Sequence, residues 1–357
     1  MRISLLTYST RPRGGVVHTL ALAEALARAG QQVTVWSLGR GGDAAFFRPV
    51  APAVRLRLVP FPDVPGEDVG ARILRSIEVL GAAFTAGDAD VVHAQDCISA
   101  NAVGDCVRTV HHLDTFTTPE LAACHERAVV APRALVCVSA AVAAEVATGW
   151  GRVATVIPNG VDAGRFAAAA GPAGAAGRRA WRERLGRYVL AVGGIEPRKG
   201  TLDLVEAFAL VQRQRPELSL VVAGGETLFD YRDYRTRVFD RAAQLGVAPV
   251  VLGPVDHDAL PTLVAAAEAF AFPSTKEGFG LAAMEALAAG VPVVTRDLPV
   301  LREVFDGAAA FADDPAGLAA GLLAGGSPAQ RAAGRALAAG HSWDAAARAH
   351  LDLYRSL

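Results

Sequence analysis

The sequence predicts an α/β fold of two domains, each built on a parallel, doubly wound sheet. The length of 357 residues exceeds what one hydrophobic core organises and fits two domains of ordinary size. Short apolar runs of strand length alternate with longer helix-forming runs along the chain. Both halves contain a strand, a glycine-containing loop and a helix in succession, at 3–29 and 188–213. Because ligands of such sheets bind at the carboxyl ends of the strands, the loops that follow strands are the candidate functional segments.

The first half begins with an apolar strand at 3–8 that leads into a loop rich in arginine and glycine. This loop covers 10–18, and a helix is predicted to follow it over 18–29. We therefore expect Gly14 and Gly15 to lie in the loop, where glycine makes the backbone adaptable. Further strands are expected at 33–36 and 54–59, a helix at 72–84, and a short strand that ends in His111 and His112.

The second half is expected to begin after a linker. The run 164–180 is rich in alanine, glycine and arginine, contains Pro172 and lacks helical periodicity, which predicts an interdomain linker. The elements expected next are strands at 188–192, 218–223 and 250–252, a loop at 193–200 and an amphipathic helix at 201–213. They form a second Rossmann-like half.

The stretch 270–295 holds the densest set of signals. An apolar strand at 269–272 ends at Pro273, a helix is predicted over 281–289 and stops at Gly290, and another strand follows at 291–294. The loop 274–280 contains two glycines, which let a ligand approach the backbone closely. Since this loop leads into a helix N-terminus, where free N–H groups and the helix dipole attract anions, the stretch predicts a phosphate site.

Two glutamates, Glu277 and Glu285, flank the start of that helix. Eight residues at about 1.5 Å of rise each would separate them by about 12 Å along a regular helix. Paired glycosidase carboxylates lie about 5 to 9.5 Å apart, so this pair is poorly placed for acid and base catalysis on one bond. It is better suited to the two ends of a long ligand, such as a sugar and a ribose joined through phosphate. The alternative is an ordinary surface helix with two solvated glutamates.

Composition argues against several classes of function. The formal net charge of −1 disfavours nucleic acid as the main partner, because binding to its phosphates requires a basic excess. The four cysteines show no C-x-x-C spacing, which disfavours a zinc site or a disulfide framework and favours a cytoplasmic location. The first apolar run is too short for a signal peptide, and no run of 18 apolar residues occurs. We expect no membrane span, which leaves room for peripheral contact with a membrane.

The sequence P-S-T-K-E-G-F-G-L-A-A-M-E-A-L-A-A-G-V-P-V-V, at 273–294, resembles the E-x7-E signature of retaining GT-B glycosyltransferases, specifically of glycosyltransferase family 4. The resemblance extends over nearly the whole chain, including segments 90–94, 135–139 and 156–162 and a closing helix within 341–357. It implies a GT-B fold of two Rossmann-like, doubly wound domains that face each other across a cleft. The acceptor-side domain would cover 1–165 with the closing helix, and the nucleotide-sugar donor domain would cover 166–340.

The resemblance also implies the roles of residues in the signature. Glu277 would contact hydroxyls of the donor sugar, and Glu285 would hold the ribose of the nucleotide. Backbone N–H groups of Gly280 and Leu281 would meet the pyrophosphate, with Phe279 as a further donor-binding residue.

In the first half, the T-V-H match makes His111 a candidate contact to the donor sugar near the reaction centre, in preference to His112. The alternative for such a histidine is a structural residue. By the same resemblance, Gly14 and Gly15 would approach the donor phosphates or the acceptor.

Lysine is rare in this chain, which draws attention to its two occurrences. Lys199 and Lys276 are the only lysines among 35 basic residues, and both lie in loops that the resemblance assigns to the donor. This composition suggests that a compact ammonium group is required there. Lys199 matches the family's pyrophosphate lysine. Where the family usually has an arginine this chain has Gly194, and Arg198 is the candidate substitute.

Two D-x-D tripeptides, at 88–90 and 256–258, resemble the metal motif of the other common glycosyltransferase architecture. The first adjoins an apolar strand, and the second stands where an N-cap is expected before a helix over 259–267. We therefore expect structural roles for both tripeptides, and neither a metal ion nor a cofactor.

The resemblance implies a retaining transfer of a sugar, a hexosyl group in particular, from a UDP-, GDP- or ADP-sugar to an unidentified acceptor hydroxyl. In such front-face transfer the leaving pyrophosphate helps to deprotonate the acceptor, and no protein nucleophile is needed. Lys199, Arg198 and the helix at Gly280 would stabilise charge, and His111, Glu277 and Glu285 would position the substrate. The expected catalytic residues are His111, Lys199 and Glu277.

Two other classes of protein fit parts of the sequence. G-F-G-L-A-A at 278–283 matches G-x-G-x-x-A, and Glu303 lies about 20 residues further on, as in an NAD(P)-dependent oxidoreductase. Residues 274–277 separate the strand from the first glycine, however, and an acidic Glu277 beside a pyrophosphate argues against this class. A non-catalytic protein that binds nucleotide sugars is the other alternative.

Overall fold

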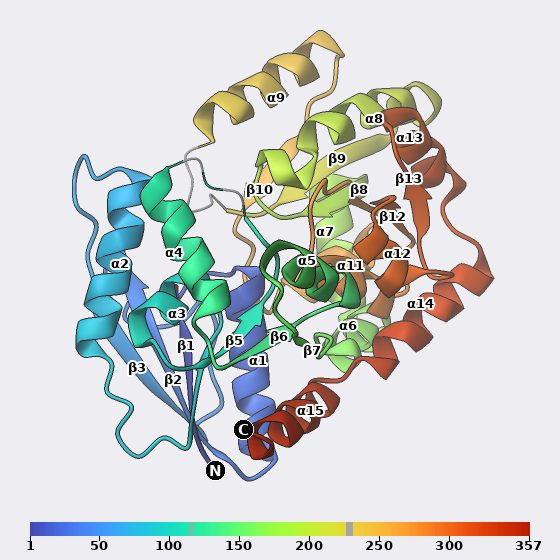
Figure 1. Cartoon of the computed structure of the whole chain (residues 1–357). Coiled ribbons are helices and arrows are strands. Elements are labelled where there is room, and N and C mark those ends of the chain that lie inside the picture. Colours follow the sequence, from blue (N-terminus) through green and yellow to red (C-terminus); the bar gives the residue numbers. More distant parts are fainter. Residues whose placement is uncertain (115, 117, 226–230) are drawn as a thin grey trace. The chain divides into compact units, whose positions relative to one another are not determined.

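The computed structural model describes residues 1–114, 116, 118–225 and 231–357, which form two compact units. Unit 1 comprises Met1–Gly160 and Trp343–Leu357, and unit 2 comprises Val161–Ser342. Each unit consists of one parallel sheet with helices packed on it (Figure 1). The predicted domain boundary at 165 falls inside a helix of unit 2, α6 (Ala163–Ala170).

Unit 1 contains a seven-stranded sheet in the order β3-β2-β1-β4-β5-β6-β7, with every neighbouring pair parallel. The order reverses between β1 and β4, which makes their carboxyl ends the switch point where doubly wound sheets bind ligands. The strands are β1 (Arg2–Thr7), β2 (Gln32–Arg40), β3 (Val54–Phe61), β4 (Val91–Ala94), β5 (Val107–Val110), β6 (Ala134–Cys137) and β7 (Thr155–Val156).

The helices of unit 1 include one from the end of the chain. That helix, α15, packs against α1 (Figure 1). The helices are α1 (Gly14–Arg28), α2 (Val69–Ala83), α3 (Cys97–Val103), α4 (Pro119–Val130), α5 (Ala140–Trp150) and α15 (Trp343–Arg355). In the described part of the chain, no helix is both long and apolar enough to cross a bilayer.

The start of α1 differs from the prediction. The helix begins at Gly14 rather than His18, so the expectation that Gly14 and Gly15 lie in a loop is wrong. Val16 and Thr19 are buried in the first turns. Burial of this face outweighs the helix propensity cost of the two glycines, which is about 1 kcal/mol each.

Unit 2 contains a six-stranded parallel sheet in the order β10-β9-β8-β11-β12-β13. Its switch point lies between β8 and β11, the strands that precede the two candidate loops. The strands are β8 (Arg187–Val192), β9 (Leu218–Ala223), β10 (Val250–Gly253), β11 (Ala269–Phe272), β12 (Val293–Arg296) and β13 (Ala310–Ala312).

In unit 2, two helices and one 3-10 turn precede the first strand, and the other helices and the second 3-10 turn follow strands. They are α6 (Ala163–Ala170), η1 (Pro172–Gly174), α7 (Ala175–Leu185), η2 (Pro197–Lys199), α8 (Thr201–Gln214), α9 (Arg232–Gln244), α10 (Leu260–Ala266), α11 (Leu281–Ala288), α12 (Pro299–Phe305), α13 (Pro315–Ala324) and α14 (Pro328–Gly340).

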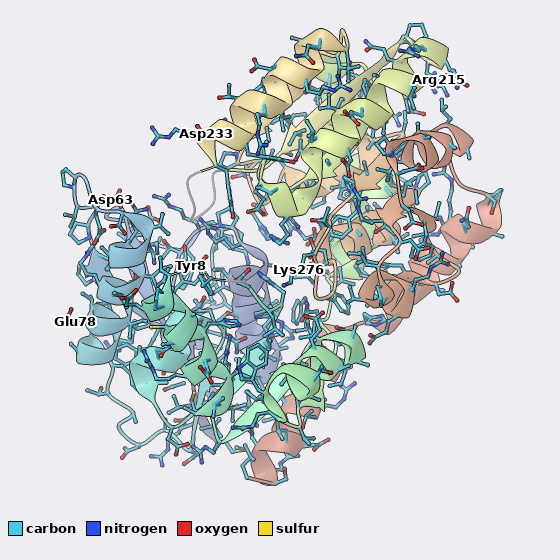
Figure 2. The ribbon with its side chains drawn as sticks, turned by 45° about the horizontal axis from the view of Figure 1, so that its top comes forward. Tyr8, Asp63, Glu78, Arg215, Asp233 and Lys276 are labelled. Atoms are coloured by element: carbon cyan, nitrogen blue, oxygen red, sulfur yellow. The ribbon has the colours of Figure 1, made fainter. Side chains whose placement is uncertain are left out.

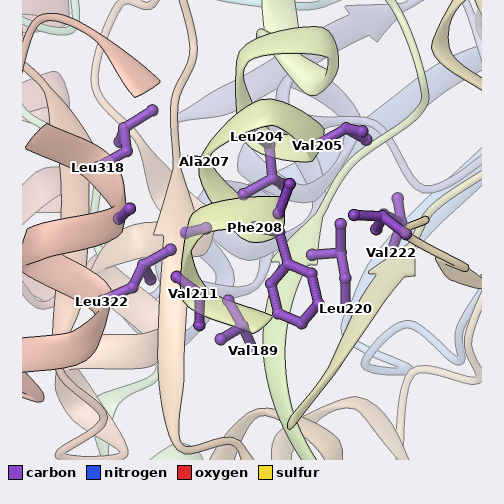
Figure 3. Close-up of a cluster of buried hydrophobic side chains, with 14 of the residues drawn as sticks. Val189, Leu204, Val205, Ala207, Phe208, Val211, Leu220, Val222, Leu318 and Leu322 are labelled. Carbon is purple, nitrogen blue, oxygen red and sulfur yellow. The ribbon is translucent and has the colours of Figure 1, made fainter. Parts of the chain in front are cut away.

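The core of unit 2 fixes α8 against the sheet and against α13. Figure 3 shows Phe208 and Leu204 of α8 between Leu220 of β9 and Leu318 and Leu322 of α13. Each such buried side chain contributes about 1.5–3 kcal/mol. Because η2 leads directly into α8, this packing also fixes the position of the loop that carries Lys199.

The predicted linker at 164–180 is wrong, because this run forms α6, η1 and the first part of α7. Alanine is the strongest helix former, and Gly171 with Pro172 only divides the run into two helices. Phe166 is buried, and α6 packs against α10 and α11. The segment is therefore part of the packed structure of unit 2.

Candidate active site

Two loops meet at the switch point of the unit 2 sheet: residues 193–200, after β8, and residues 273–280, after β11. The backbone N–H of Thr275 donates a 2.8 Å hydrogen bond to the carbonyl of Arg198. Gly200 has φ +64°, and a Cβ there would stand 2.2 Å from the carbonyl oxygen of Pro273. The close contact between the loops thus requires glycine at this position.

Three predicted donor-binding side chains join in one charged cluster. Lys199 Nζ donates to Glu277 Oε1 at 2.5 Å, and Arg198 Nη1 donates to the same oxygen at 3.1 Å. Arg198 Nη2 also donates to Glu196 Oε1 at 2.9 Å. All of these side chains are partly buried, so their charges interact more strongly than at an exposed surface.

The position of Lys199 depends on two neighbours. Its ammonium group lies 5.2 Å from the centre of the Phe272 ring, and its alkyl chain lies against Gly193. A Cβ on Gly193 would stand 3.3 Å from Cε of Lys199, at φ +144°. Gly194, where the resemblance implies an arginine, follows directly, and the nearby guanidinium is that of Arg198 on η2. Whether Arg198 replaces the missing arginine stays a prediction.

The N-terminus of α11 lies at the end of the second loop. Gly280 is the N-cap, with φ +97°, and as a glycine it provides no side-chain cap for the N–H groups of the first turn. A Cβ on Gly280 would stand 2.9 Å from Cε2 of Phe305, so glycine is required here as well. Phe279 is buried, with its ring centre 5.7 Å from that of His341. Leu281 is the first residue of the helix, and Lys276 lies on the loop before it (Figure 2).

Glu277 and Glu285 do not lie on one helix, contrary to the geometry behind the expected separation of about 12 Å. Glu277 stands in the loop, because α11 begins only at Leu281, and the helical rise therefore does not set its separation from Glu285. The observed start of α11 agrees with the predicted loop at 274–280 and the predicted helix from Leu281, and Gly280, with its positive φ, stands between the two.

Glu285 lies in the middle of α11 and is half-buried. Burial raises the pKa of this carboxyl group to about 7, with Arg165 opposing the shift and Asp162 adding to it. Arg165 is on α6, donates to the carbonyl of His257 and pairs with Asp258 at 3.6 Å. The segment predicted as a linker thus carries Arg165, whose charge lowers the pKa of a candidate site residue, Glu285.

The D-x-D tripeptides have local partners. Asp88 and Asp90 pair with Arg2 at 3.3 and 3.1 Å. Asp256 accepts from the backbone N–H of Asp258 at 2.8 Å in a turn before α10, whose N-cap is Ala259 without a side-chain bond. The prediction of an N-cap at 256–258 is therefore wrong, because the tripeptide closes on itself one step before the helix.

Within residues 1–114, 116, 118–225 and 231–357, no group of three or more His, Cys, Asp or Glu side chains is placed to hold a metal ion. That a metal is not needed stays a prediction.

In unit 1, His111 follows β5 and lies beside the first turn of α1. A Cβ on Gly15 would stand 3.5 Å from Cδ2 and 3.6 Å from Nε2 of His111, whereas a Cβ on Gly14 would meet no atom within 4 Å. Burial, with smaller effects of His112 and Arg108, lowers the pKa of His111 to about 3. The neutral ring suits an uncharged hydroxyl. His112 instead pairs with Asp114 at 3.3 Å.

Sequence reasoning missed a cluster of buried histidines around His111. His18 of α1, His93 of β4 and His350 of α15 are fully buried, and their ring centres lie 5.5 to 6.2 Å from one another in the pairs His93–His350 and His18–His350. The positions of His18 and His350 on the apolar faces of amphipathic helices were the available signal.

Two family models match the chain, Glycosyltransferase Family 4 over residues 12–165 and Glycosyl transferases group 1 over residues 179–320. The D-inositol 3-phosphate glycosyltransferase of Xylanimonas cellulosilytica is 31% identical over 411 residues, which cover 99% of this chain and 96% of that protein. The enzyme of the same name from Salinispora arenicola is 42% identical over 150 residues, 39% of this chain. That match spans only 33% of the Salinispora protein.

Solved structures share the fold. Sucrose-phosphate synthase from Thermosynechococcus elongatus has a TM-score of 0.80 at 21% identity, covering 100% of this chain and 98% of its own. Anabaena HepE, in complex with UDP and glucose, has a TM-score of 0.75 at 20% identity, covering 100% of both chains. At such identities the likeness concerns the fold alone.

Proposed function

Since the chain belongs to the GT-B glycosyltransferases of family 4, glycosyl transferases group 1, we propose that it transfers a hexosyl group from a nucleoside diphosphate sugar to an acceptor hydroxyl, with retention of the anomeric configuration. The observation that carries the proposal is the cluster of Lys199, Arg198 and Glu277 at the switch point of unit 2, next to the start of α11, whose N-cap is a glycine.

The donor pyrophosphate would bind between the two cations and the backbone N–H groups of Gly280 and Leu281. Without a ligand, Glu277 offsets the charges of Lys199 and Arg198 and holds both groups in place. Donors that are fixed in advance stabilise developing charge without reorganisation during the reaction, which is the largest catalytic effect in many enzymes. In the bound state, Glu277 would accept hydrogen bonds from sugar hydroxyls.

The chemical step needs no nucleophile from the protein. The bond between the anomeric carbon and the pyrophosphate oxygen breaks, and the acceptor oxygen forms its bond on the same face of the sugar. The acceptor proton passes to the departing phosphate oxygen. Lys199 and Arg198 would stabilise the negative charge that develops on the leaving group.

Glu285 would hold the ribose hydroxyls through its carboxylate. A pKa near 7 means that this group changes charge near neutral pH. In unit 1, the neutral imidazole of His111 would contact a hydroxyl of the donor sugar, and the N–H groups at Gly14 and Gly15 would lie toward the donor phosphates or the acceptor.

The kind of donor has support from the comparisons. Anabaena HepE was solved with UDP and glucose, and several relatives are named D-inositol 3-phosphate glycosyltransferase or phosphatidyl-myo-inositol mannosyltransferase. These names support a nucleotide-sugar donor and a hydroxylated acceptor of the cyclitol or sugar class.

A thermal-shift screen with UDP-glucose, GDP-mannose, ADP-glucose and NADH tests the proposal. A ligand at about 100 times its Kd stabilises the protein by about 2.7 kcal/mol. We expect one sugar nucleotide to stabilise the protein and to be hydrolysed slowly, and NADH to do neither. Incubation with acceptor extracts and analysis of the product anomer by NMR then test transfer and retention. Stabilisation without any turnover would favour a binding protein, and stabilisation by NADH alone an oxidoreductase.

A further inference from the structure

We propose that His18 is a positioning residue, which holds the imidazole of His111 in the orientation and the uncharged state that the transfer needs, and that Asn159 fixes His18 in turn. This inference rests on the proposed function, in which His111 contacts the donor sugar. It assigns a role to a buried polar pair that the reaction scheme above leaves without one.

The two imidazoles are in direct contact. His18 lies on the buried face of α1 and has no exposed surface. Its ring centre lies 4.7 Å from that of His111, with an angle of 76° between the planes, in the edge-to-face arrangement that aromatic rings favour. His111 is half-buried directly after a short strand, and the contact with His18 restrains one side of its ring.

His18 itself is fixed from two further sides. Its Nδ1 lies 2.8 Å from Oδ1 of Asn159. Because an amide oxygen only accepts, Nδ1 carries the proton and Nε2 is the unprotonated nitrogen. The ring of Trp343 lies 5.3 Å away, again edge to face. The bond to Asn159 therefore determines both the tautomer and the rotation of His18.

The residues that fix His18 come from the two places where the chain leaves and re-enters unit 1. Asn159 precedes Gly160, the last residue of the first segment, and Trp343 begins the second segment. These segments are in close contact, since a Cβ on Gly160 would stand 2.4 Å from the backbone nitrogen of Trp343. His18 thus contacts both the segments at this junction and His111.

The groups around His18 and His111 keep the imidazole of His111 uncharged. The titratable groups that face it are His18 from α1, His350 from α15, His93 from β4, and the neighbouring His112 and Arg108, none of them acidic. A proton on either imidazole would be repelled by the others and poorly solvated. The neutral His111 can then exchange hydrogen bonds with a sugar hydroxyl.

The unpaired nitrogen atoms of the two rings agree with this role. Nε2 of His18 and Nε2 of His111 are both buried, and neither has a hydrogen-bond partner within the described residues, as is also true of Nε2 of His350. Unpaired buried nitrogen atoms destabilise a fold. For His111, a sugar hydroxyl would supply the missing partner.

A double-mutant cycle on turnover tests the proposal. His18→Phe keeps a ring of similar size and removes the bond to Asn159, and His111→Ala removes the group that His18 is proposed to position. The assay is hydrolysis of UDP-glucose, or of whichever sugar nucleotide the screen identifies, with kcat and KM measured separately. UDP affinity is measured by calorimetry.

We expect His18→Phe to lower kcat by about 10- to 100-fold, since a small misplacement of a positioned group has effects of this size. UDP affinity should stay within about twofold, because the side chains proposed to bind the nucleotide, Lys199, Arg198 and Glu285, are in unit 2. In the His111→Ala background, adding His18→Phe should lower kcat by less than about twofold. Equal losses in both backgrounds would overturn the proposal. Should His18→Phe fail to fold, His18→Gln keeps a donor for Asn159 without the ring and serves in the same cycle.

His125→Phe is the matched control. It removes a buried imidazole of unit 1 that lies on α4 and has a ring contact to Trp150. We expect this variant to change Tm and to leave kcat within about twofold. A loss of kcat as large as that of His18→Phe would mean that the removal of any buried imidazole from unit 1 impairs turnover, and the specific role of His18 would fall.

A measurement without turnover separates this inference from the proposed function. In protein labelled with 15N-histidine, Asn159→Leu should shift the ring signals of His111, although Asn159 acts only through His18. In the His18→Phe background the same change should leave the signals of His111 where they are. Unchanged signals in the single variant would refute the inference whatever the activity. A wild-type protein that turns over no sugar nucleotide, with the signal shifts present, would count against the proposed function instead.

Discussion

At the scale of single residues, the two lysines offer the sharpest contrast. Lys199 bonds to Glu277 and lies over Phe272, whereas Lys276 contributes its backbone carbonyl to Arg198. If Lys199 stabilises the leaving group, Lys199→Ala should reduce turnover more than it weakens donor binding. A loss of about 3 kcal/mol corresponds to a rate about 150-fold lower. Steady-state kinetics with the identified donor measure this split between kcat and KM.

Two controls accompany the Lys199 variant. Lys276→Ala removes the only other lysine from the same region, and we expect kcat to change by less than about threefold. Lys199→Arg keeps the charge and changes its shape, and we expect a clear loss, because a guanidinium cannot replace a compact ammonium at a fitted site. Full activity of Lys199→Arg, or a rise in KM alone for Lys199→Ala, would contradict the assigned role.

Glu285 gives a second prediction at this scale. Glu285→Gln should weaken binding of the free nucleoside diphosphate by about 10- to 100-fold, since a hydrogen bond to a charged group contributes about 1.5–3 kcal/mol. With a pKa of about 7, the wild-type carboxyl group ionises as the pH rises through neutrality. The ratio of wild-type to variant affinity should therefore be larger at pH 8 than at pH 6. Calorimetric titrations with UDP and GDP at both pH values measure it, and a constant ratio would exclude the ribose role.

At the scale of elements, the first turn of α1 separates a structural from a functional role of its glycines. Both glycines have helical backbone, and a Cβ on Gly15 would make only ordinary contacts. Gly15→Ala should therefore stabilise the helix by about 0.5–1 kcal/mol. If the backbone there approaches the donor or acceptor, kcat/KM should fall nevertheless. Thermal unfolding and kinetics of the same sample test both effects together.

A matched glycine exists in α5. Gly149 lies near the end of that helix, and a Cβ there would meet no atom within 4 Å. Gly149→Ala should raise Tm slightly and leave kcat/KM unchanged. Should Gly15→Ala behave in the same way, the first turn of α1 has no close contact with substrate, and Gly14 and Gly15 are structural residues.

Other elements show what local sequence could and could not predict. Strand β11 and the helix after Gly280 follow from an apolar run, a proline and a run of helix formers. The helices α6 and α7 did not, because Gly171 and Pro172 in an alanine-rich run look the same in a linker and in a break between two helices. Only the burial of Phe166, which depends on α10 and α11, distinguishes the two cases.

At the scale of the whole molecule, the recurring strand, loop and helix pattern predicted two doubly wound parallel sheets, and both sheets are found, with the same strand order over their first six strands. The side chains of the candidate site were largely predicted from the signature and the glycine loops. Their pairing was not, since Lys199 and Glu277 are 78 residues apart and meet only through the parallel order of β8 and β11. The histidine cluster joins α1, β4, β5 and α15, which no local pattern connects.

The stabilities of the two units are expected to depend on pH in opposite directions. In unit 1, burial holds the pKa of His111 at about 3 and of His350 at about 4, below the ordinary 6.5. Between about pH 4 and 6.5 the unfolded chain thus binds more protons, so unit 1 loses stability as the pH falls. The raised pKa of the buried Asp96 acts in the opposite direction, whereas the lowered pKa values of the buried His18 and His93 add to the effect. In unit 2, Glu285 has a pKa of about 7 against 4.5 when unfolded, so the folded form binds more protons and unit 2 loses stability as the pH rises between these values.

Tryptophan positions allow each unit to be followed separately. Trp36, Trp150 and Trp343 lie in unit 1, and Trp181 lies in unit 2. In protein labelled with fluorotryptophan, urea titrations followed by 19F NMR should give a lower midpoint at pH 5 than at pH 7.5 for the first three signals. The midpoint of the Trp181 signal should move the other way and be higher at pH 5 than at pH 7.5. The corresponding change in the free energy of unfolding should be about 1–3 kcal/mol, a range that allows for solvent screening of the half-buried Glu285. Glu285→Gln should abolish the shift of Trp181, and His350→Phe should reduce that of unit 1. Four midpoints that move together in one direction would show that the two units do not carry these opposing dependences.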